Sequence, residues 1–137
     1  MKLKKLYSAI ILRYDKETFE MLNLIDAYIT WGFVNKKTIS EILHKRGSYQ
    51  DQSGTAVQLQ NDLIENSLGK FSILCLEDII HELNTCGKSF NEVMKFLGFF
   101  LLSPTDEIKE KINIPFYKGG SQGFRGDEIN QLLKKMI

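Results

Sequence analysis

The residues that could carry acid–base or metal chemistry are few and scattered along the chain. His81 follows Glu77 and Asp78 and precedes Glu82, a set that could hold a metal ion or share a proton if the side chains met. Their spacing is helical, and carboxylates on a helix mostly stay in solvent. His44, the other histidine, stands far from both cysteines. The sequence therefore favours a solvated helix face over a catalytic site, and we expect no metal and no cofactor.

The two cysteines, Cys75 and Cys86, are too few for a disulfide framework. Cys75 lies in the apolar run of residues 71–76, where a thiol is more often a small core residue than a nucleophile. We therefore expect both thiols to be reduced and the protein to be intracellular.

A glycine-rich stretch lies near the C-terminus, where Gly119, Gly120, Gly123 and Gly126 alternate with other residues. Glycines let a backbone approach a phosphate or another protein closely. The stretch has neither the spacing of a dinucleotide-binding loop nor the Gly-Lys-Ser/Thr ending of a nucleotide-binding loop. It therefore predicts close contact with a partner rather than nucleotide chemistry, and we expect no enzyme.

Charge is distributed unevenly along a chain whose net charge is only +1. Residues 1–13 carry four cations and no acid, residues 36–46 carry four cations against Glu41, and residues 51–92 carry seven acids against two lysines. Basic clusters of this kind suit an anionic partner, but they also suit solvated helix ends. For Tyr28 and Trp31, core packing explains the aromatic rings better than base stacking.

The length of 137 residues and the 43% hydrophobic content predict one domain with a core of its own. No apolar run approaches the roughly 20 residues of a membrane span, and the Lys-rich N-terminus lacks the apolar region of a signal peptide. We therefore expect no membrane association.

The apolar periodicity predicts strands and helices in alternation. We expect a strand in residues 8–14, then a helix from its N-cap Asp15 to Gly32. A capping box of Thr38 and Glu41 predicts a short second helix. A polar loop at 47–54 and a second strand at 55–59 follow, and then a helix capped by Asn61.

The centre of the pattern is residues 67–83. Gly69 is expected to end a helix with positive φ, and residues 71–76 to form a buried strand. Glu77 and Asp78 then begin a helix. Two further helices are expected, one opened by a capping box of Ser89 and Glu92 and one from about 127 to 136.

These elements predict an α+β fold: a small antiparallel sheet with helices packed on one face, a ferredoxin-like β-α-β-α-β core, and a C-terminal helical extension. Residues 1–98 would form the core domain with its covering helices. Residues 99–137 would form the extension, ending in a helix, as part of the same single domain.

Five blocks of sequence resemble a known family. They cover residues 27–33, 44–47, 66–71, 76–82 and 127–130. In this order they are similar to the large-subunit ribosomal protein seven of eukaryotes, whose bacterial and archaeal relatives are the large-subunit ribosomal protein thirty. The resemblance runs from about Leu6 to the C-terminus.

The resemblance implies a non-catalytic structural constituent of the large ribosomal subunit that binds and stabilises ribosomal RNA. Its partners would be large-subunit ribosomal RNA and neighbouring large-subunit proteins, with no homo-oligomer. It would act in the cytoplasm after assembly in the nucleolus.

Positions that match cationic or glycine sites of the family are expected to face RNA, because lysine and arginine pair with phosphates and glycine allows close approach. These positions are Lys45, Arg46, Gly47, Lys70, Lys88, Tyr117, Lys118, Gly119, Gly120, Lys134 and Lys135. To them we add Lys2, Lys4, Lys5, Lys36, Lys37, Tyr49 and Arg125.

The chain departs from the family in three places. Eukaryotic members usually begin with a long basic helical extension, whereas this sequence starts at Met1 almost at the globular domain. The loop after Arg46 is polar instead of basic, and the segment after Pro104 carries Asp106, Glu107 and Glu110. Each missing cation removes a bond to phosphate. We interpret the chain as a shortened member from an organism with reduced ribosomes.

Three alternatives compete with this interpretation, although the second lacks a convincing phosphate-binding loop and partner residues. The first is a ribosome-biogenesis factor of the same family that acts on precursors of the large subunit. The second is a small enzyme of acylphosphatase-like architecture that holds a phosphate with Arg46 or Arg125. The third is a protein-only interaction module that uses the aromatic segment from Phe96 to Phe100.

Overall fold

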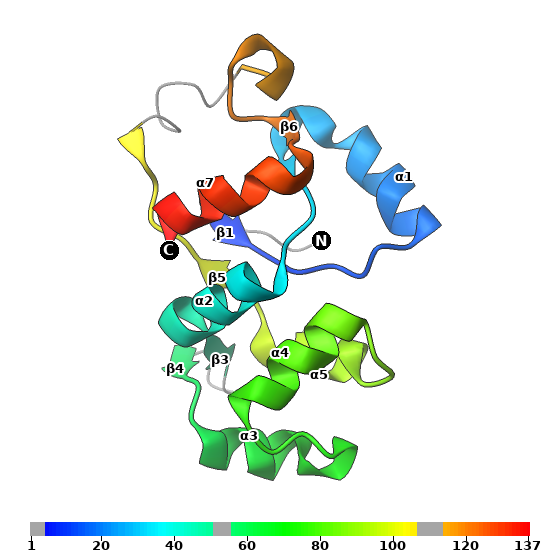
Figure 1. Ribbon diagram of the computed structural model, residues 1–137, viewed down its shortest axis with the longest axis vertical. Helices are drawn as coiled ribbons and strands as arrows, with labels where there is room; N and C mark the ends of the chain where they lie inside the picture. The colour runs from blue at the N-terminus through cyan, green and yellow to red at the C-terminus, as the bar shows by residue number, and fades with distance from the viewer. Residues whose placement is uncertain (1–4, 51–55, 107–113) are drawn as a thin grey trace. The chain divides into compact units, whose positions relative to one another are not determined.

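The computed structural model describes residues 5–50, 56–106 and 114–137 (Figure 1). The chain divides into two compact units. Unit 1 comprises residues 1–11, 36–102 and 137, and unit 2 comprises residues 12–35 and 103–136. Each unit therefore combines segments from both ends of the chain. The boundary expected at residue 98 stays a prediction.

Unit 1 contains four helices and two antiparallel strand pairs among its described residues. The helices are α2 (Lys36–Arg46), α3 (Asn61–Leu68), α4 (Leu76–Thr85) and α5 (Phe90–Leu97), with a 3-10 helix at Gly69–Phe71. The strands β1 (Ser8–Ala9) and β5 (Phe100–Leu101) pair with each other, and β3 (Ser48–Gln50) pairs with β4 (Ala56–Gln58).

The core of unit 1 lies among these helices and β5. α4 turns Ile79, Ile80 and Leu83 inward, as the i, i+1, i+4 spacing predicts for one helix face. α2 packs on α4 through its own buried stripe of Ile39, Ile42 and Leu43. Other fully buried side chains are Ile64, Val93, Leu97 and Phe100.

Unit 2 is built around a short parallel strand pair. β2 (Thr30–Trp31) pairs with β6 (Gly123–Phe124), so that Trp31 lies opposite Phe124. Among its described residues, the unit contains the helices α1 (Lys16–Leu24) and α7 (Ile129–Met136). Its 3-10 helices are Asp26–Tyr28, Phe116–Lys118 and Gly126–Glu128.

One buried amide ties the two segments of unit 2 together. The Asn130 side chain accepts a hydrogen bond from the backbone N–H of Asn35 at 3.0 Å. It donates to the carbonyl oxygens of Phe33 at 2.9 Å and Asp127 at 2.8 Å. Asn130 thus holds the chain after β2 against the start of α7.

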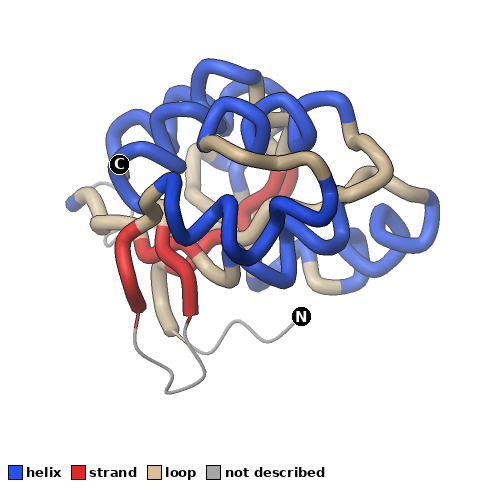
Figure 2. The backbone as a smooth tube through the Cα atoms, turned by 90° about the horizontal axis from the view of Figure 1, so that it is seen from below, coloured by secondary structure: helices blue, strands red, loops and turns tan. Residues whose placement is uncertain are grey.

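The predicted α+β class is confirmed, and most of the described backbone is helical (Figure 2). The strands form three two-stranded pairings in the described part of the chain. The strands expected at 8–14 and 55–59 are present in shorter form as β1 and β4, and the C-terminal helix is present as α7.

The strand predicted at residues 71–76 does not form. Instead the chain makes the 3-10 helix Gly69–Phe71, takes φ +62° at Ser72 and enters α4 at Leu76. The Asp78 carboxylate accepts hydrogen bonds from the backbone N–H groups of Leu74 and Cys75. Because both N–H groups bond to this carboxylate at the start of α4, they cannot take part in a strand ladder. Leu74 is also 54% exposed, which does not fit a buried strand.

Several predicted helix boundaries are also wrong. α3 does end before Gly69 as predicted, but Gly69 has φ −55°, and Ser72 takes the left-handed conformation instead. The helix after Asp15 ends at Leu24 instead of reaching Gly32. α2 begins at Lys36, which places Thr38 inside the helix as a buried residue and not at its cap.

Two residues predicted as N-caps lie at the N-cap position but make no side-chain capping hydrogen bond. Asp15 and Ser89 precede α1 and α5, but neither side chain caps its helix. The N–H of Ser89 donates to the Glu82 carboxylate, and Glu92 pairs with Lys95 at 2.8 Å. The predicted box of Ser89 and Glu92 therefore does not form.

Candidate nucleic-acid interface

α2 carries exposed lysines at both of its ends. Lys36 and Lys37 occupy its first turn, which contains no acid, and Lys45 lies in its last turn. Cations at a helix N-terminus face the positive end of the helix dipole, which disfavours them, whereas Lys45 is favoured at the other end. An anionic partner would relieve the unfavourable charge at the N-terminal end.

Arg46 and Gly47, which follow Lys45, serve the fold. The half-buried Arg46 donates a hydrogen bond from Nε to the carbonyl oxygen of Ile137 at 3.1 Å. Gly47 is buried, and a Cβ there would lie 2.3 Å from the Leu43 oxygen and 2.6 Å from a Leu59 methyl carbon. Gly47 is therefore explained by close packing within unit 1.

The other predicted positions of unit 1 differ in how accessible they are. Tyr49 stacks on Phe96, with ring centroids 4.8 Å apart and planes inclined by 23°. Lys70 and Lys88 are exposed, one in the 3-10 helix after α3 and one between α4 and α5. Lys5 is also exposed. Lys2 and Lys4 lie outside the described residues.

The glycine-rich stretch of unit 2 forms a tight turn after the 3-10 helix Phe116–Lys118. Tyr117 and Lys118 are exposed, and the Lys118 ammonium lies 5.6 Å from the Tyr117 ring centroid. Gly119 is exposed with φ +83°. Gly120 is buried and closely packed, since a Cβ there would lie 1.8 Å from the Ile114 carbonyl oxygen.

Arg125 stabilises this turn through contacts with Phe116 and Gly120. Its guanidinium lies 4.5 Å from the Phe116 ring centroid, and Nη2 donates to the Gly120 carbonyl oxygen at 2.9 Å. Burial lowers the pKa of Arg125, while the nearby Glu128 carboxylate acts in the opposite direction. The side chain is half-buried, so its contacts within the turn account for it without an RNA partner.

The last turn of α7 presents two more predicted cations. Lys134 and Lys135 are exposed there, where the helix dipole favours positive charge. The structure thus groups the predicted residues by unit: α2 and its continuation in unit 1, and the glycine turn and α7 in unit 2.

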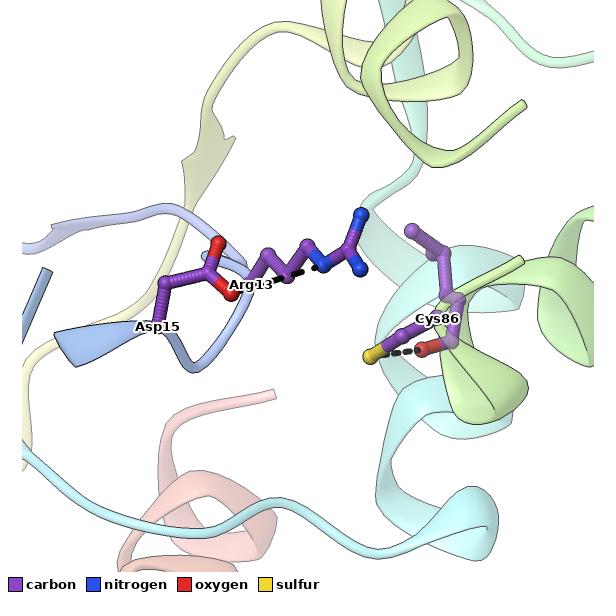
Figure 3. A network of polar contacts seen from close by, with 4 residues as sticks. Arg13, Asp15 and Cys86 are labelled. Carbon is purple, nitrogen blue, oxygen red and sulfur yellow. Dashed lines mark hydrogen bonds and ion pairs between the residues drawn. The ribbon is translucent and has the colours of Figure 1, made fainter. Parts of the chain in front are cut away.

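The residues considered for catalysis remain separate in the described part of the chain. No three histidine, cysteine or carboxylate side chains gather there as metal ligands. Cys75 is half-buried and Cys86 exposed, both as free thiols. Cys86 donates a weak hydrogen bond to the Leu83 oxygen at 3.9 Å (Figure 3). Arg46 lies in unit 1 and Arg125 in unit 2, and each donates to a carbonyl of its own unit.

The aromatic segment from Phe96 to Phe100 is largely core. Phe96, Leu97 and Phe100 are buried, which leaves little of this segment for a protein partner. None of the described helices has the length and apolar character needed to cross a membrane.

Unit 2 exposes a group of aromatic side chains that were not predicted from the sequence. Trp31 is buried as expected, but Tyr28 is 84% exposed, so its predicted core position is wrong. Tyr14, Phe19 and Phe33 are also exposed. The alternation of Trp31 and Phe33 about Gly32 could have indicated a strand at this place, with both rings on one face.

Comparison with known proteins extends the sequence resemblance over the whole chain. No family model matches the sequence. The chain is 41% identical to the large ribosomal subunit protein uL30 of Caenorhabditis elegans, covering 100% of this chain and 56% of that protein. It is 41% identical to the uL30-like 1 protein of Mus musculus and 38% identical to uL30 of Dictyostelium discoideum. These two matches cover 98% and 99% of this chain but 54% and 55% of the relatives. The chain therefore spans about half the length of the relatives it matches.

Proposed function

The chain belongs to the uL30 family of large ribosomal subunit proteins, and from this premise we propose that it is a structural constituent of the large subunit. The observation that carries the proposal is 41% identity along the entire chain to a protein of that name. In this role it binds and stabilises large-subunit ribosomal RNA, contacts neighbouring subunit proteins and performs no catalysis. It acts in the cytoplasm as a single copy, after assembly in the nucleolus.

Lys36, Lys37 and Lys45 are the primary RNA contacts in this proposal. All three are exposed on one helix, and the first two lie at the end where the dipole opposes their charge. Phosphate groups supply the missing negative charge, and contacts to the RNA backbone require no base-specific geometry.

Five further lysines extend the phosphate contacts, since each is exposed at or near the end of a helix. They are Lys70, Lys88, Lys118, Lys134 and Lys135. Tyr117 and Gly119 offer an exposed turn for close approach. Other predicted positions contribute indirectly, because their packing and hydrogen bonds inside the fold position the elements that carry these cations. They are Gly47, Gly120, Tyr49, Arg46 and Arg125.

The salt dependence of RNA binding tests this assignment. Removing one lysine–phosphate pair should flatten the slope of log affinity against log salt by about 0.7 to 1. We expect the variant with Lys36→Gln, Lys37→Gln and Lys45→Gln to bind large-subunit ribosomal RNA with a slope flatter by about 2 to 3. Filter binding at a series of salt concentrations around the physiological value would measure it.

The matched control is Lys95→Gln, which neutralises an exposed lysine of α5 that already pairs with Glu92. This variant should leave the slope unchanged. If the triple variant and the unmodified chain have the same slope, α2 is not the RNA-facing element.

A further inference from the structure

Five aromatic side chains of unit 2 form a closed cycle of ring contacts, which we call the aromatic cluster. Its members are Tyr14, Phe19, Trp31, Phe33 and Phe124. Neighbouring centroids lie between 4.5 Å, for Trp31 and Phe124, and 6.0 Å, for Tyr14 and Phe19. Four of the five contacts are edge-to-face, so the rings present both faces and edges around the cycle.

Most of this cluster is open to solvent. Trp31 is the inner member, 9% exposed, with its indole N–H donating to Asp26 at 2.7 Å. Tyr14 is 59% exposed, Phe33 and Phe124 are each 46% exposed, and Phe19 is 37% exposed. Contiguous aromatic surface of this kind marks an interaction site, because a solvated cluster of rings is costly to maintain.

Along the chain, the charges next to Tyr14 and Phe124 are mainly negative. Exposed carboxylates follow Tyr14 along the chain at Asp15, Glu17 and Glu20. A second exposed pair, Asp127 and Glu128, follows Phe124. The cations on these segments are Arg13, Lys16 and Arg125.

Two of these three cations already have local partners. The Arg13 guanidinium lies 3.7 Å from the Asp15 carboxylate (Figure 3). Arg125 is held over Phe116 and bonded to the Gly120 oxygen. Lys16 is then the one cation of these two segments left to balance the other carboxylates, so the segments around Tyr14 and Phe124 carry net negative charge.

We propose that the aromatic cluster and its flanking carboxylates form a docking surface for an arginine-rich segment of another protein. Guanidinium groups stack on aromatic faces and pair with carboxylates at the same time. Each single cation–ring pair at an exposed site is weak, so several arginines are needed for measurable affinity. The inference rests on the proposed function in one respect, since the partner would be a neighbouring protein of the large subunit.

Two other occupants fit the surface less well. Proteins that stack nucleic-acid bases on aromatic rings normally combine the rings with a positively charged groove, whereas the carboxylates of the segments around Tyr14 and Phe124 would repel phosphate. A second copy of this chain would place the same carboxylates against each other.

Trp31 allows a direct test, because it is the single tryptophan of the chain and contacts two members of the cluster. We would titrate the full chain with a short peptide of repeated Arg-Gly-Ser at physiological salt and follow tryptophan fluorescence. A saturable change is expected. The variant with Tyr14→Leu and Phe33→Leu should bind about tenfold more weakly, as the removal of two cation–ring pairs implies.

Variants that change only charge test the docking surface without altering the packing of the rings. The triple variant with Asp15→Asn, Glu17→Gln and Glu20→Gln should bind the peptide several-fold more weakly. The matched control neutralises one exposed Asp and two exposed Glu of unit 1, Asp62→Asn, Glu65→Gln and Glu77→Gln, and should leave the affinity unchanged. Far-UV circular dichroism would verify the fold of each variant.

Three results would overturn the inference. The first is an absence of peptide binding, and the second is equal weakening by both sets of charge variants. The third is stronger binding of oligouridine than of the peptide, with loss in the Tyr14→Leu and Phe33→Leu variant, which would make the cluster a base-stacking surface.

Ribosomal RNA binding of the same variants separates this inference from the proposed function. If the proposed function and the docking surface are both correct, the variants of the aromatic cluster retain their affinity for ribosomal RNA but bind the peptide more weakly. If the chain binds no ribosomal RNA but still binds the peptide, the proposed function fails and the docking surface stands.

Discussion

At the scale of single residues, the fold uses several side chains that the sequence alone assigned to RNA. Arg125 bonds to the Gly120 oxygen, and Tyr49 stacks on Phe96. Lys45 and Lys118, in contrast, are exposed. Residue type could suggest a cationic or aromatic contact, but it could not tell whether the partner lies inside or outside the molecule.

Asn130 is the clearest case of a residue whose role depends on structure. Replacing it with alanine removes the hydrogen bonds to the Asn35 N–H and to the Phe33 and Asp127 oxygens. We expect Asn130→Ala to lower the free energy of unfolding by about 2 to 4 kcal/mol. Urea denaturation would measure the change. The exposed Asn23→Ala of α1 serves as the control and should change the free energy by less than about 0.5 kcal/mol.

Asp78 makes stability depend on pH. Hydrogen bonds from the backbone N–H of Leu74, then from the Cys75 thiol and, more weakly, from the Cys75 backbone N–H lower the pKa of Asp78 below its ordinary value of 3.8. A lowered carboxyl pKa contributes stability above the ordinary value, which is lost as pH falls through the lowered pKa.

The Asp78→Asn variant should therefore be less stable than the unmodified chain at neutral pH, by about 1 kcal/mol as for the loss of other N-terminal caps. The difference should shrink as pH falls below 3.8 and the unmodified carboxylate becomes protonated. Urea denaturation from neutral pH down to below that value would follow it, with Glu77→Gln as the control. A difference that is independent of pH would contradict the helix-capping role of the charge.

At the scale of elements, helices with a clear apolar face were predictable and short strands were not. The spacing of Ile79, Ile80 and Leu83 identified the buried face of α4. The apolar run before it predicted a strand, but Asp78 takes the backbone donors of Leu74 and Cys75 for the helix start. A local side-chain bond thus overrode the β propensity of the run.

The aromatic cluster shows the second reason for failure. Trp31 and Phe124 are far apart in the chain and meet only because β2 pairs with β6. The alternation of Trp31 and Phe33 could indicate the first strand but not its partner, because β6 contains only two residues, too few to give a recognisable alternation. Nothing local in the sequence could therefore bring the five rings together.

Two glycines that follow helices of unit 1 should respond in opposite ways to alanine. A Cβ at Gly47 would lie 2.3 Å from the Leu43 oxygen, whereas at Gly69 the nearest side-chain atom would be 4.0 Å away and φ is −55°. We expect Gly47→Ala to destabilise the protein by about 1 to 3 kcal/mol because of overpacking. Gly69→Ala should be neutral or stabilising by up to about 1 kcal/mol. Thermal unfolding of both variants would decide, and destabilisation by Gly69→Ala would contradict the right-handed conformation found there.

At the scale of the whole molecule, the family was evident in the sequence because five blocks agreed in order. The similarity to uL30 proteins over the whole chain confirms this interpretation. The chain nevertheless spans about half the length of these relatives, so the role that their names state comes to it as a proposal. The composition could not supply this conclusion, since a net charge of +1 is ordinary for a globular protein.

Sedimentation of the protein in a sucrose gradient tests the central proposal most directly. A lysate of the source cells would be fractionated with and without ribonuclease, and each fraction probed for this protein by mass spectrometry. The proposal predicts migration with mature large subunits and translating polysomes, at about the stoichiometry of other subunit proteins, and release by ribonuclease. Confinement to precursor particles would contradict it in favour of a biogenesis factor, and a peak at the top of the gradient would contradict any ribosomal role.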